Sequence, residues 1–453
     1  MAESTNTIQK EIQDREAKEK RELRRKRRRR NQILAILTLL LFVCLIVAII
    51  GTGVWYIMHR GAGKTAGGGA ATTEENTIDN LFESEDEIVK PEETNTEPAL
   101  TPEQQLDAIL DEAFISQMPL EDKVAGLFIV TPESITGVSK AVKAGDGTKD
   151  ALNKYAVGGI VYASQNMQDA AQFTEMVSNT TLYSRYALFT CVAEEGGSST
   201  SLEKAGLADK TDSEQAMGTG ADAAKAYEAS GKIADSMLTY GLNLNFAPVA
   251  DLATVQDSYL KDASYGSDAA LAASFVTSAV QGMQEKGISS CLKYFPGAAD
   301  MKEDPAKGMA SSERTAEQLA AEEFTVFKAG IDAGADMVMV GHVAVPALTG
   351  DNTPCSLSSA VITDKLRNEL GFNGVIITDA MNKGAITEYY EADEAAILAL
   401  KAGCDMILCP DDFEKAYNGV LEAVQNGTIS EERINDSLRR IYRIKYAGMM
   451  PEA

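Results

Sequence analysis

The sequence predicts an α/β protein whose main domain is a (β/α)₈ TIM barrel, preceded by one transmembrane helix and a disordered linker. Two observations predict the barrel. Eight short apolar runs alternate with stretches of helical periodicity from about residue 105 onward. The runs are apolar at nearly every position, which is typical of parallel strands buried on both faces. Eight such units favour a closed barrel over the alternative, an open doubly wound sheet.

The N-terminal segment predicts a membrane anchor. Residues 1–32 form a basic tail that ends in RRKRRRR at 24–30, and residues 33–58 contain no charged side chain. The uncharged stretch is long enough to cross a bilayer core of about 30 Å. The basic block is expected to stay in the cytoplasm, so we expect a single-pass protein of the cell membrane with an extracytoplasmic main domain. A cleaved signal peptide is the alternative, and the length of the apolar stretch disfavours it.

Residues 59–104 are rich in Gly, Ala, Thr, Glu and Asn, which indicates a flexible acidic linker before a main domain at 105–453. The net charge of the whole chain is −25 although its N-terminal tail is basic. The main domain is therefore strongly acidic and repels phosphate backbones. Nucleic acid is not an expected partner.

Cysteine and histidine usage gives no metal-binding pattern. The chain has six cysteines and two histidines, and no two cysteines have the C-x-x-C spacing. We expect no metal site and no cofactor, and we expect most of the thiols to be buried and inert. Because no oligomer interface is evident in the sequence, we expect a monomer.

The predicted strands follow one another at intervals that leave room for helices. They are LFIV (127–130), GGIVYA (158–163), ALFTCVA (187–193), LNLNFAPVA (242–250), SCLKYF (290–295), DMVMVGH (336–342), GVIITDA (374–380) and DMILCP (405–410). Amphipathic patterns between them include 268–286 and 315–334, each of which ends near a glycine, as helices often do.

Polar residues gather at the ends of the predicted strands, where a barrel carries its chemistry. They are Glu194 and Glu195 after the third run, Asp251 after the fourth, Lys293 at the end of the fifth, His342 in the sixth and Asp379 in the seventh. An ammonium group at a buried strand end needs a partner or a ligand. Asp251 fits a turn cap equally well and His342 fits a core histidine equally well, whereas Asp379, directly after a β-branched run, favours function.

Three motifs resemble glycoside hydrolase family 3, in particular its single-domain bacterial β-N-acetylhexosaminidase branch. They are GLNLNFAPVAD (241–251), LKYFPG (292–297) and GFNGVIITDAM (371–381), and the similarity covers essentially all of 105–450 in one consistent order. The resemblance implies a retaining glycosidase that acts on β-linked amino-sugar glycans, so the expected partner is a glycan or peptidoglycan fragment.

The resemblance also assigns roles to residues. It implies that Asp379 is the nucleophile and that Asp304 is the aspartate of a dyad whose histidine shuttles a proton. It implies substrate binding by Lys293, Asp251, His342 and Glu194. The chain departs from the family pattern where the proton-shuttling histidine is replaced by Ala306, which cannot transfer a proton.

Other departures fall on polar positions of the family: Tyr294 and Ala298 replace histidines, Ala263 and Ser198 replace arginines, and Ala193 replaces an acidic residue. Loss of general acid–base help typically costs about 10²–10⁴-fold in rate. One hypothesis is therefore a glycosidase with weak or altered hydrolysis, in which Asp304, Glu303, Asp300 or Glu194 replaces the acid. The alternative is a catalytically inactive glycan-binding or scaffold protein. A barrel aldolase that uses Lys293 for a Schiff base is a third, weaker hypothesis.

Overall fold

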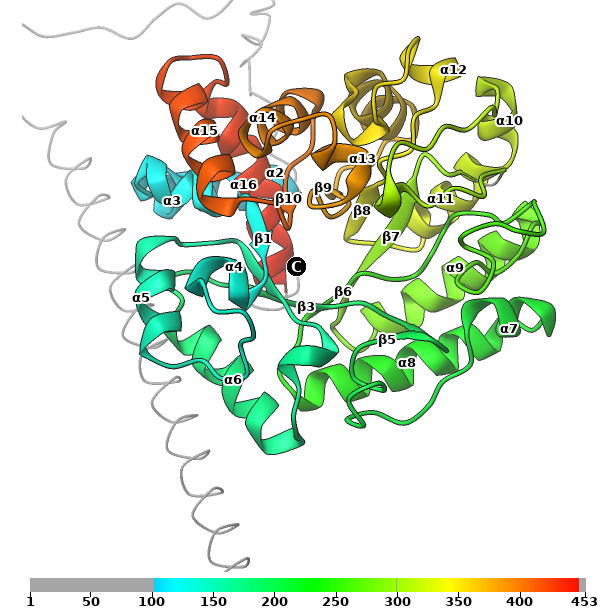
Figure 1. Ribbon diagram of the computed structural model, residues 1–453, viewed down its shortest axis with the longest axis horizontal. Helices are drawn as coiled ribbons and strands as arrows, with labels where there is room; N and C mark the ends of the chain where they lie inside the picture. The colour runs from blue at the N-terminus through cyan, green and yellow to red at the C-terminus, as the bar shows by residue number, and fades with distance from the viewer. Residues whose placement is uncertain (1–101, 299, 448–453) are drawn as a thin grey trace, which may run out of the picture. The chain divides into compact units, whose positions relative to one another are not determined.

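The computed structural model describes residues 102–298 and 300–447 (Figure 1). The expected basic tail, the expected transmembrane helix and nearly all of the expected linker lie outside these residues. Within 102–298 and 300–447, no helix is long and apolar enough to span a bilayer. The first described helix, α2 (Pro102–Ala113), begins three residues before the position where we expected the main domain to start.

Eight parallel strands form the central sheet, and each lies inside one of the eight predicted runs or within one residue of it. They are β1 (Phe128–Val130), β2 (Gly159–Val161), β3 (Phe189–Val192), β6 (Leu244–Asn245), β7 (Ser289–Phe295), β8 (Met337–Val340), β9 (Val375–Thr378) and β10 (Ile407–Leu408). Their order in the sheet is β10-β1-β2-β3-β6-β7-β8-β9. A separate two-stranded hairpin, β4 (Glu194–Gly196) and β5 (Ser199–Thr200), follows β3.

The sheet closes on itself. Strand β10 pairs in parallel with β1, where Phe128 lies opposite Ile407, and Ile377 of β9 bridges in parallel to Met406 just before β10. The α/β barrel that the sequence predicts is confirmed, and the doubly wound alternative is wrong. Every residue of β1, β3, β8 and β9 is buried, because the barrel interior covers one face and helices cover the other.

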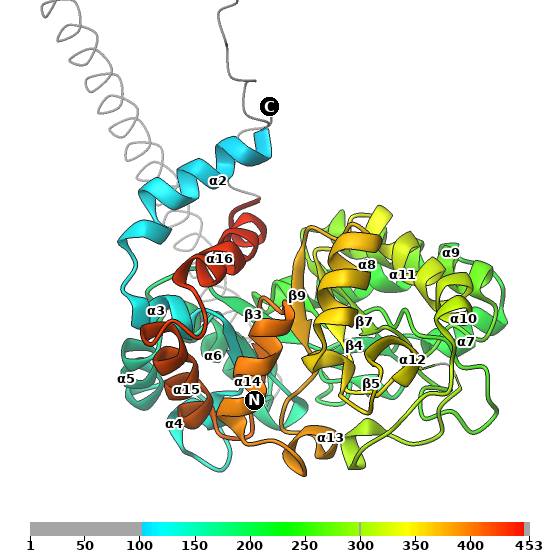
Figure 2. The same cartoon turned by 90° about the horizontal axis from the view of Figure 1, so that it is seen from above.

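Helices surround the barrel (Figures 1 and 2). They are α3 (Leu120–Ala125), α4 (Pro132–Thr136), α5 (Asp146–Lys154), α6 (Ala170–Tyr183), α7 (Glu214–Thr219), α8 (Ala224–Thr239), α9 (Ala269–Gln284), α10 (Ala316–Ala321), α11 (Glu323–Asp332), α12 (Pro346–Thr349), α13 (Gly384–Thr387), α14 (Ala392–Ala402), α15 (Phe413–Gln425) and α16 (Glu431–Tyr446), together with a π-helical segment at Ala360–Glu369.

The two helices expected at 268–286 and 315–334 have different outcomes. The first is α9, which the side chain of Asp268 caps by accepting a hydrogen bond from the Leu271 N–H. The second is divided into α10 and α11 at Glu322, whose φ of −117° and ψ of −76° depart from the values of a regular helix. Glu322 and the neighbouring Glu323 both form ion pairs with Arg314, so the break coincides with a charge cluster that the periodicity does not reveal.

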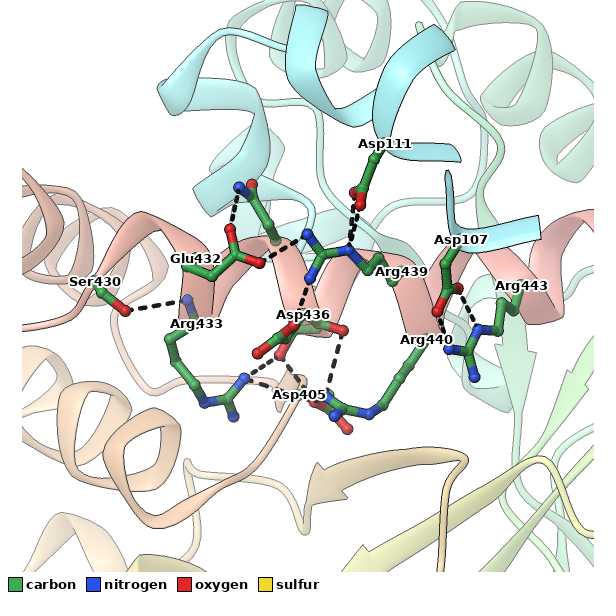
Figure 3. A network of polar contacts seen from close by, with 12 residues as sticks. Asp107, Asp111, Asp405, Ser430, Glu432, Arg433, Asp436, Arg439, Arg440 and Arg443 are labelled. Carbon is green, nitrogen blue, oxygen red and sulfur yellow. Dashed lines mark hydrogen bonds and ion pairs between the residues drawn. The ribbon is translucent and has the colours of Figure 1, made fainter. Parts of the chain in front are cut away.

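A network of charged side chains joins α2 and α16 at the end of the barrel where the strands begin (Figure 3). Arg439 of α16 donates to both carboxylate oxygens of Asp111 at 2.8 Å. Asp405, fully buried just before β10, lies 2.7 Å from a guanidinium nitrogen of Arg367 and 3.0 Å from one of Arg440. Because the carboxylate is surrounded by positive partners, it is satisfied in a place where an isolated charge would be costly.

The described cysteines lie in the core or at its edge. Cys191, Cys291, Cys355 and Cys404 are buried, Cys409 is half-buried, and all five are free thiols. Burial raises the pKa of the Cys409 thiol to about 12, which keeps it protonated. Cys44 lies outside the described residues.

Candidate active site

A cavity of about 270 Å³ opens at the carboxyl ends of the barrel strands. Carboxylates, tyrosines, one histidine and one lysine line it together with small apolar residues. The lining residues are Glu195, Asp251, Tyr259, Leu260, Ala263, Tyr294, Ala298, Asp304, Pro305, Ala306, Gly341, His342, Val343, Asp379 and Lys383. This is the end of a barrel at which active sites are built.

The cavity brings together residues that the sequence singled out on separate segments. Asp379 directly follows β9, His342 lies two residues beyond β8, and Asp251 lies in the segment after β6. Asp304 and Ala306 come from the loop after β7. Residues 128 positions apart in the chain are neighbours here because parallel strands of one barrel end at the same rim.

Asp379 is a buried carboxylate with a positive partner. Its Oδ1 accepts a hydrogen bond from the Ala380 N–H at 2.7 Å, and its Oδ2 lies 2.7 Å from the Nζ of Lys383. Burial alone would raise the pKa of Asp379. The positive charge of Lys383, together with the hydrogen bonds from Lys383 and from the Ala380 N–H, outweighs burial and lowers the pKa of Asp379 below its usual value. The group is therefore ionised at neutral pH.

Both ring nitrogens of His342 form hydrogen bonds within the protein, and one of these bonds is to the residue after Asp379. Its Nε2 lies 3.0 Å from the carbonyl oxygen of Ala380, and its Nδ1 lies 2.8 Å from the Oγ of Ser356. A carbonyl oxygen can only accept, so Nε2 carries the proton and Nδ1 accepts from the serine hydroxyl. Burial lowers the pKa of His342, which favours this neutral form. The histidine thus holds the peptide that follows Asp379.

Asp251 holds the turn after β7. Both of its carboxylate oxygens accept from the Ala298 N–H, at 2.9 and 3.0 Å. Gly297 in this turn has a φ of +100°, and a Cβ there would lie 2.5 Å from the Cγ of Glu323. The turn of the KYFPG motif therefore requires glycine at 297. Burial raises the pKa of Asp251 well above its usual value.

Lys293 does not line the cavity itself, but it pairs with a residue that does. Its ammonium group forms a buried ion pair with Glu195, which is a lining residue. Burial would lower the pKa of Lys293, but the carboxylate of Glu195 outweighs burial and raises it. A Schiff base needs a neutral amine, so the charged, paired Lys293 does not support the aldolase hypothesis.

The loop after β7 is folded onto the rim. Asp304 caps the short 3₁₀ turn Pro305–Lys307 by accepting from the Ala306 N–H at 2.9 Å. The turn packs against α13 so closely that a Cβ at Gly384 would lie 2.8 Å from the Gly308 nitrogen. Ala306 consequently lines the cavity, as Asp379 does, and presents only a methyl group.

Glu194 does not lie where the resemblance puts it. It lines a different cavity, of about 250 Å³, between the 200–211 segment and α8. Its Oε1 accepts from the N–H groups of Ser201 and Leu202, and burial raises its pKa to about 7. Successive residues of a strand point to opposite sides, so the neighbouring Glu195 faces the active-site cavity instead.

Two other candidates for the replacement acid, Asp300 and Glu303, also do not line the cavity. Asp300 accepts hydrogen bonds from the Ser312 hydroxyl and the Glu313 N–H, and neither Asp300 nor Glu303 is a lining residue. Of the four candidates, only Asp304 lines the active-site cavity.

Two polar lining residues, Lys383 and Tyr259, were not singled out from the sequence. Lys383 follows Asp379 by four positions, a spacing that pairs charges on a helix. The segment between them is a turn rather than a helix, so only the fold brings the two side chains together. Glu195 was expected at a strand end together with Glu194, and the structure places only Glu195 in this cavity.

The fold and the cavity define an eight-stranded α/β barrel with a carboxylate after the seventh barrel strand and a folded loop after the fifth. Residues 119–444 match the glycosyl hydrolase family 3 N-terminal domain. The chain belongs to this family, as its motifs led us to expect.

Two bacterial proteins are similar to this chain. A beta-hexosaminidase of Stenotrophomonas maltophilia is 30% identical over 284 residues, which cover 60% of this chain and 82% of that protein. Another beta-hexosaminidase, of Xanthomonas campestris, is 32% identical and covers 57% of this chain and 79% of that protein.

Among solved structures, a glycoside hydrolase family 3 beta-N-acetylglucosaminidase from a Paenibacillus species superposes with a TM-score of 0.69 at 32% identity. The match covers 74% of this chain and 64% of that one, so the present chain spans less than two thirds of that protein's length.

Proposed function

We propose that this protein is a membrane-anchored, extracytoplasmic family 3 protein that binds β-linked amino-sugar glycans such as cell-wall fragments. In this proposal the glycan lies in the cavity at the strand ends, and Asp379 is the carboxylate that attacks the anomeric carbon. Hydrolysis is weak or altered, because Ala306 occupies the position from which a proton would be delivered.

One observation carries the proposal: Asp379, ionised and buried, lines the same cavity as Ala306 and Asp304. The nucleophilic half of a retaining site is therefore supported, whereas the acid/base half has lost its proton-transferring side chain. A retaining mechanism needs both. The relatives named beta-hexosaminidase support an amino-sugar glycan as the ligand class.

The alternative function is a catalytically inactive glycan-binding or scaffold protein on the same barrel. Ala263, Ala298 and Ala306 support it, because all three line the cavity at positions where the family resemblance implies polar groups. A cavity that has lost these polar groups can still bind a sugar through its tyrosines and remaining carboxylates.

Turnover and binding, measured on the full chain in detergent, test the proposal. We expect slow turnover of an aryl β-N-acetylglucosaminide, well below an ordinary enzymatic rate of about 1–10³ s⁻¹. We expect calorimetry to detect binding of cell-wall fragments. Asp379→Asn should remove the residual turnover and leave binding in place.

Asp411→Asn is the matched control, since Asp411 is an exposed aspartate outside the cavity. Turnover at an ordinary rate that Asp379→Asn abolishes would refute weak hydrolysis. Binding without any turnover would favour the inactive alternative. Neither binding nor turnover would refute both functions.

The proposed membrane anchor is tested separately. We expect the full chain to sediment with membranes and to resist alkaline extraction, and we expect its C-terminal part to be digested by protease added outside the cytoplasmic membrane. Deletion of 33–58 should move the protein out of the membrane fraction. A full-length chain that stays in the soluble fraction would contradict the anchor.

A further inference from the structure

Both oxygens of the Asp379 carboxylate accept a hydrogen bond. The Ala380 N–H donates to Oδ1 and the Lys383 ammonium donates to Oδ2, each at 2.7 Å. The backbone donor is fixed by the turn. The lysine donor is at the end of a flexible chain of four methylene groups, so it can be displaced without disturbing the barrel.

The environment of Lys383 holds it near Asp379. Its Nζ lies 5.5 Å from the centre of the Tyr294 ring, and the Nζ of Lys293 lies 5.4 Å from the same ring. Each of the two lysines is paired with a carboxylate of the cavity, Lys293 with Glu195 and Lys383 with Asp379. An aromatic ring attracts cations. Tyr294 therefore favours an ammonium group at this place.

The contact is partly shielded from water. The side chain of Lys383 is 27% exposed and that of Asp379 is 9% exposed. Screening by solvent is weak at such a site, so the charge of the lysine acts strongly on the carboxylate. Among the interactions that lower the pKa of Asp379, the charge of Lys383 is the largest.

We propose that Lys383 is a positioning residue that holds Asp379 in a resting ion pair, which a bound ligand must separate before Asp379 can attack. This inference rests on the proposed function, since that function makes Asp379 the attacking group. The ion pair withdraws electron density from Oδ2 and occupies one of its lone pairs. Both effects make the carboxylate a weaker nucleophile.

A substrate whose leaving group needs no protonation separates the effect of Lys383 on Asp379 from the absence of a general acid. With a dinitrophenyl β-N-acetylglucosaminide, Oδ2 of Asp379 forms a bond to the anomeric carbon. The bond from that carbon to the phenolic oxygen breaks, and the electron pair leaves with dinitrophenolate without protonation. Water then bonds to the anomeric carbon, the ester bond to Oδ2 breaks and returns its electron pair to Asp379, and one proton passes to solvent.

The experiment compares Lys383→Met, Lys383→Gln and Lys383→Arg in the full chain in detergent, by the rate at which dinitrophenolate is released. Methionine and glutamine remove the charge, and we expect them to raise the rate about tenfold or more, because charge-assisted hydrogen bonds are the strong ones. Arginine keeps the charge and should stay near the wild-type rate. Asp379→Asn should release none.

The pH profile separates this role from simple support of the fold. Titratable groups that face Asp379 are Lys383, His342, Tyr294, Tyr259, Cys291 and Cys409. Lys383 lowers the pKa of Asp379, so its removal raises that pKa. The acid limb of the profile, where Asp379 takes up a proton, should therefore move to higher pH in Lys383→Met and stay in place in Lys383→Arg.

An unchanged or lower rate in both neutral variants, with wild-type protein reacting through Asp379, overturns the inference and leaves the proposed function intact. If no form of the protein reacts, the proposed hydrolysis has failed, and titration of the Asp379 carboxyl carbon by NMR decides the role of Lys383. A pKa that rises in Lys383→Met supports the ion pair as its determinant. A pKa that stays the same overturns it.

Discussion

The side chain of Asp304 accepts a hydrogen bond from the Ala306 N–H at 2.9 Å, within a loop that lines the cavity that Asp379 also lines. The loop thus keeps a defined shape although its proton-transferring side chain is absent. A histidine at 306 should enter the same cavity. We expect the double variant Pro305→Ser, Ala306→His to raise turnover of an unactivated aryl β-N-acetylglucosaminide by about 10²–10⁴-fold.

The dependence on the leaving group checks this prediction. Ala306→Asn, which fills the same space without moving a proton, is the matched control and should stay slow. The gain from histidine should be large for poor leaving groups and small for dinitrophenolate, which needs no acid. An equal gain for every leaving group would mean that histidine acts by some other route.

We expect the buried Glu194 carboxyl to make the free energy of unfolding depend on pH. Its pKa is raised to about 7 by burial, so the folded state holds a proton over a range in which the unfolded chain has lost it. The stability contributed by the protonated group is fully present below the ordinary pKa of glutamate, about 4.3. It is lost as pH rises toward 7, and the loss should be on the order of 3 kcal/mol.

Urea unfolding at pH 4.5 and pH 7 (about the two limits of this range) measures the effect in wild type and in Glu194→Gln. Asp251 and Glu214 have raised pKa values as well and act in the same direction. The free energy of unfolding of Glu194→Gln should therefore still depend on pH, but less steeply than that of wild type, because the contribution of Glu194 is absent. An identical pH dependence in both proteins would contradict the prediction.

Asp405 predicts a large loss of stability. Asp405→Asn removes the carboxylate that Arg367, Arg433 and Arg440 share. The three guanidinium groups then lack their common anion, which should lower the free energy of unfolding by about 3–5 kcal/mol. Denaturant unfolding measures this. The exposed Asp411→Asn should change it by less than about 0.5 kcal/mol, and similar losses in the two variants would contradict the assignment.

Gly297 predicts a steric requirement in the turn beside the cavity. In Gly297→Ala the new Cβ meets Glu323 at 2.5 Å and the backbone has a φ of +100°, so we expect a loss of about 2 kcal/mol or more and weaker glycan binding. Gly287→Ala is the matched control, because its φ is +79° and nothing lies within 4 Å of its Cβ. That variant should lose only about 1 kcal/mol from backbone strain.

The barrel, and the place of Asp379, His342 and Asp251 at its rim, could be predicted from the sequence. Buried parallel strands must be apolar on both faces, so their eight runs are visible without a structure, and residues that directly follow such strands must meet at one end. Asp379, His342 and Asp251 were found in this way. The apolar frame and the motifs also identified the family, because both are local in the chain.

The tertiary structure alone decided which polar groups pair. Lys383 forms an ion pair with Asp379, and Glu195 forms one with Lys293. Glu194 lines another cavity, because adjacent residues of β4 point in opposite directions. The division of α10 from α11 at Glu322, where Glu322 and Glu323 pair with Arg314, was likewise not visible in the periodicity. Charge pairing is set by distances in space between segments far apart in sequence or separated by turns, and neither periodicity nor spacing encodes those distances.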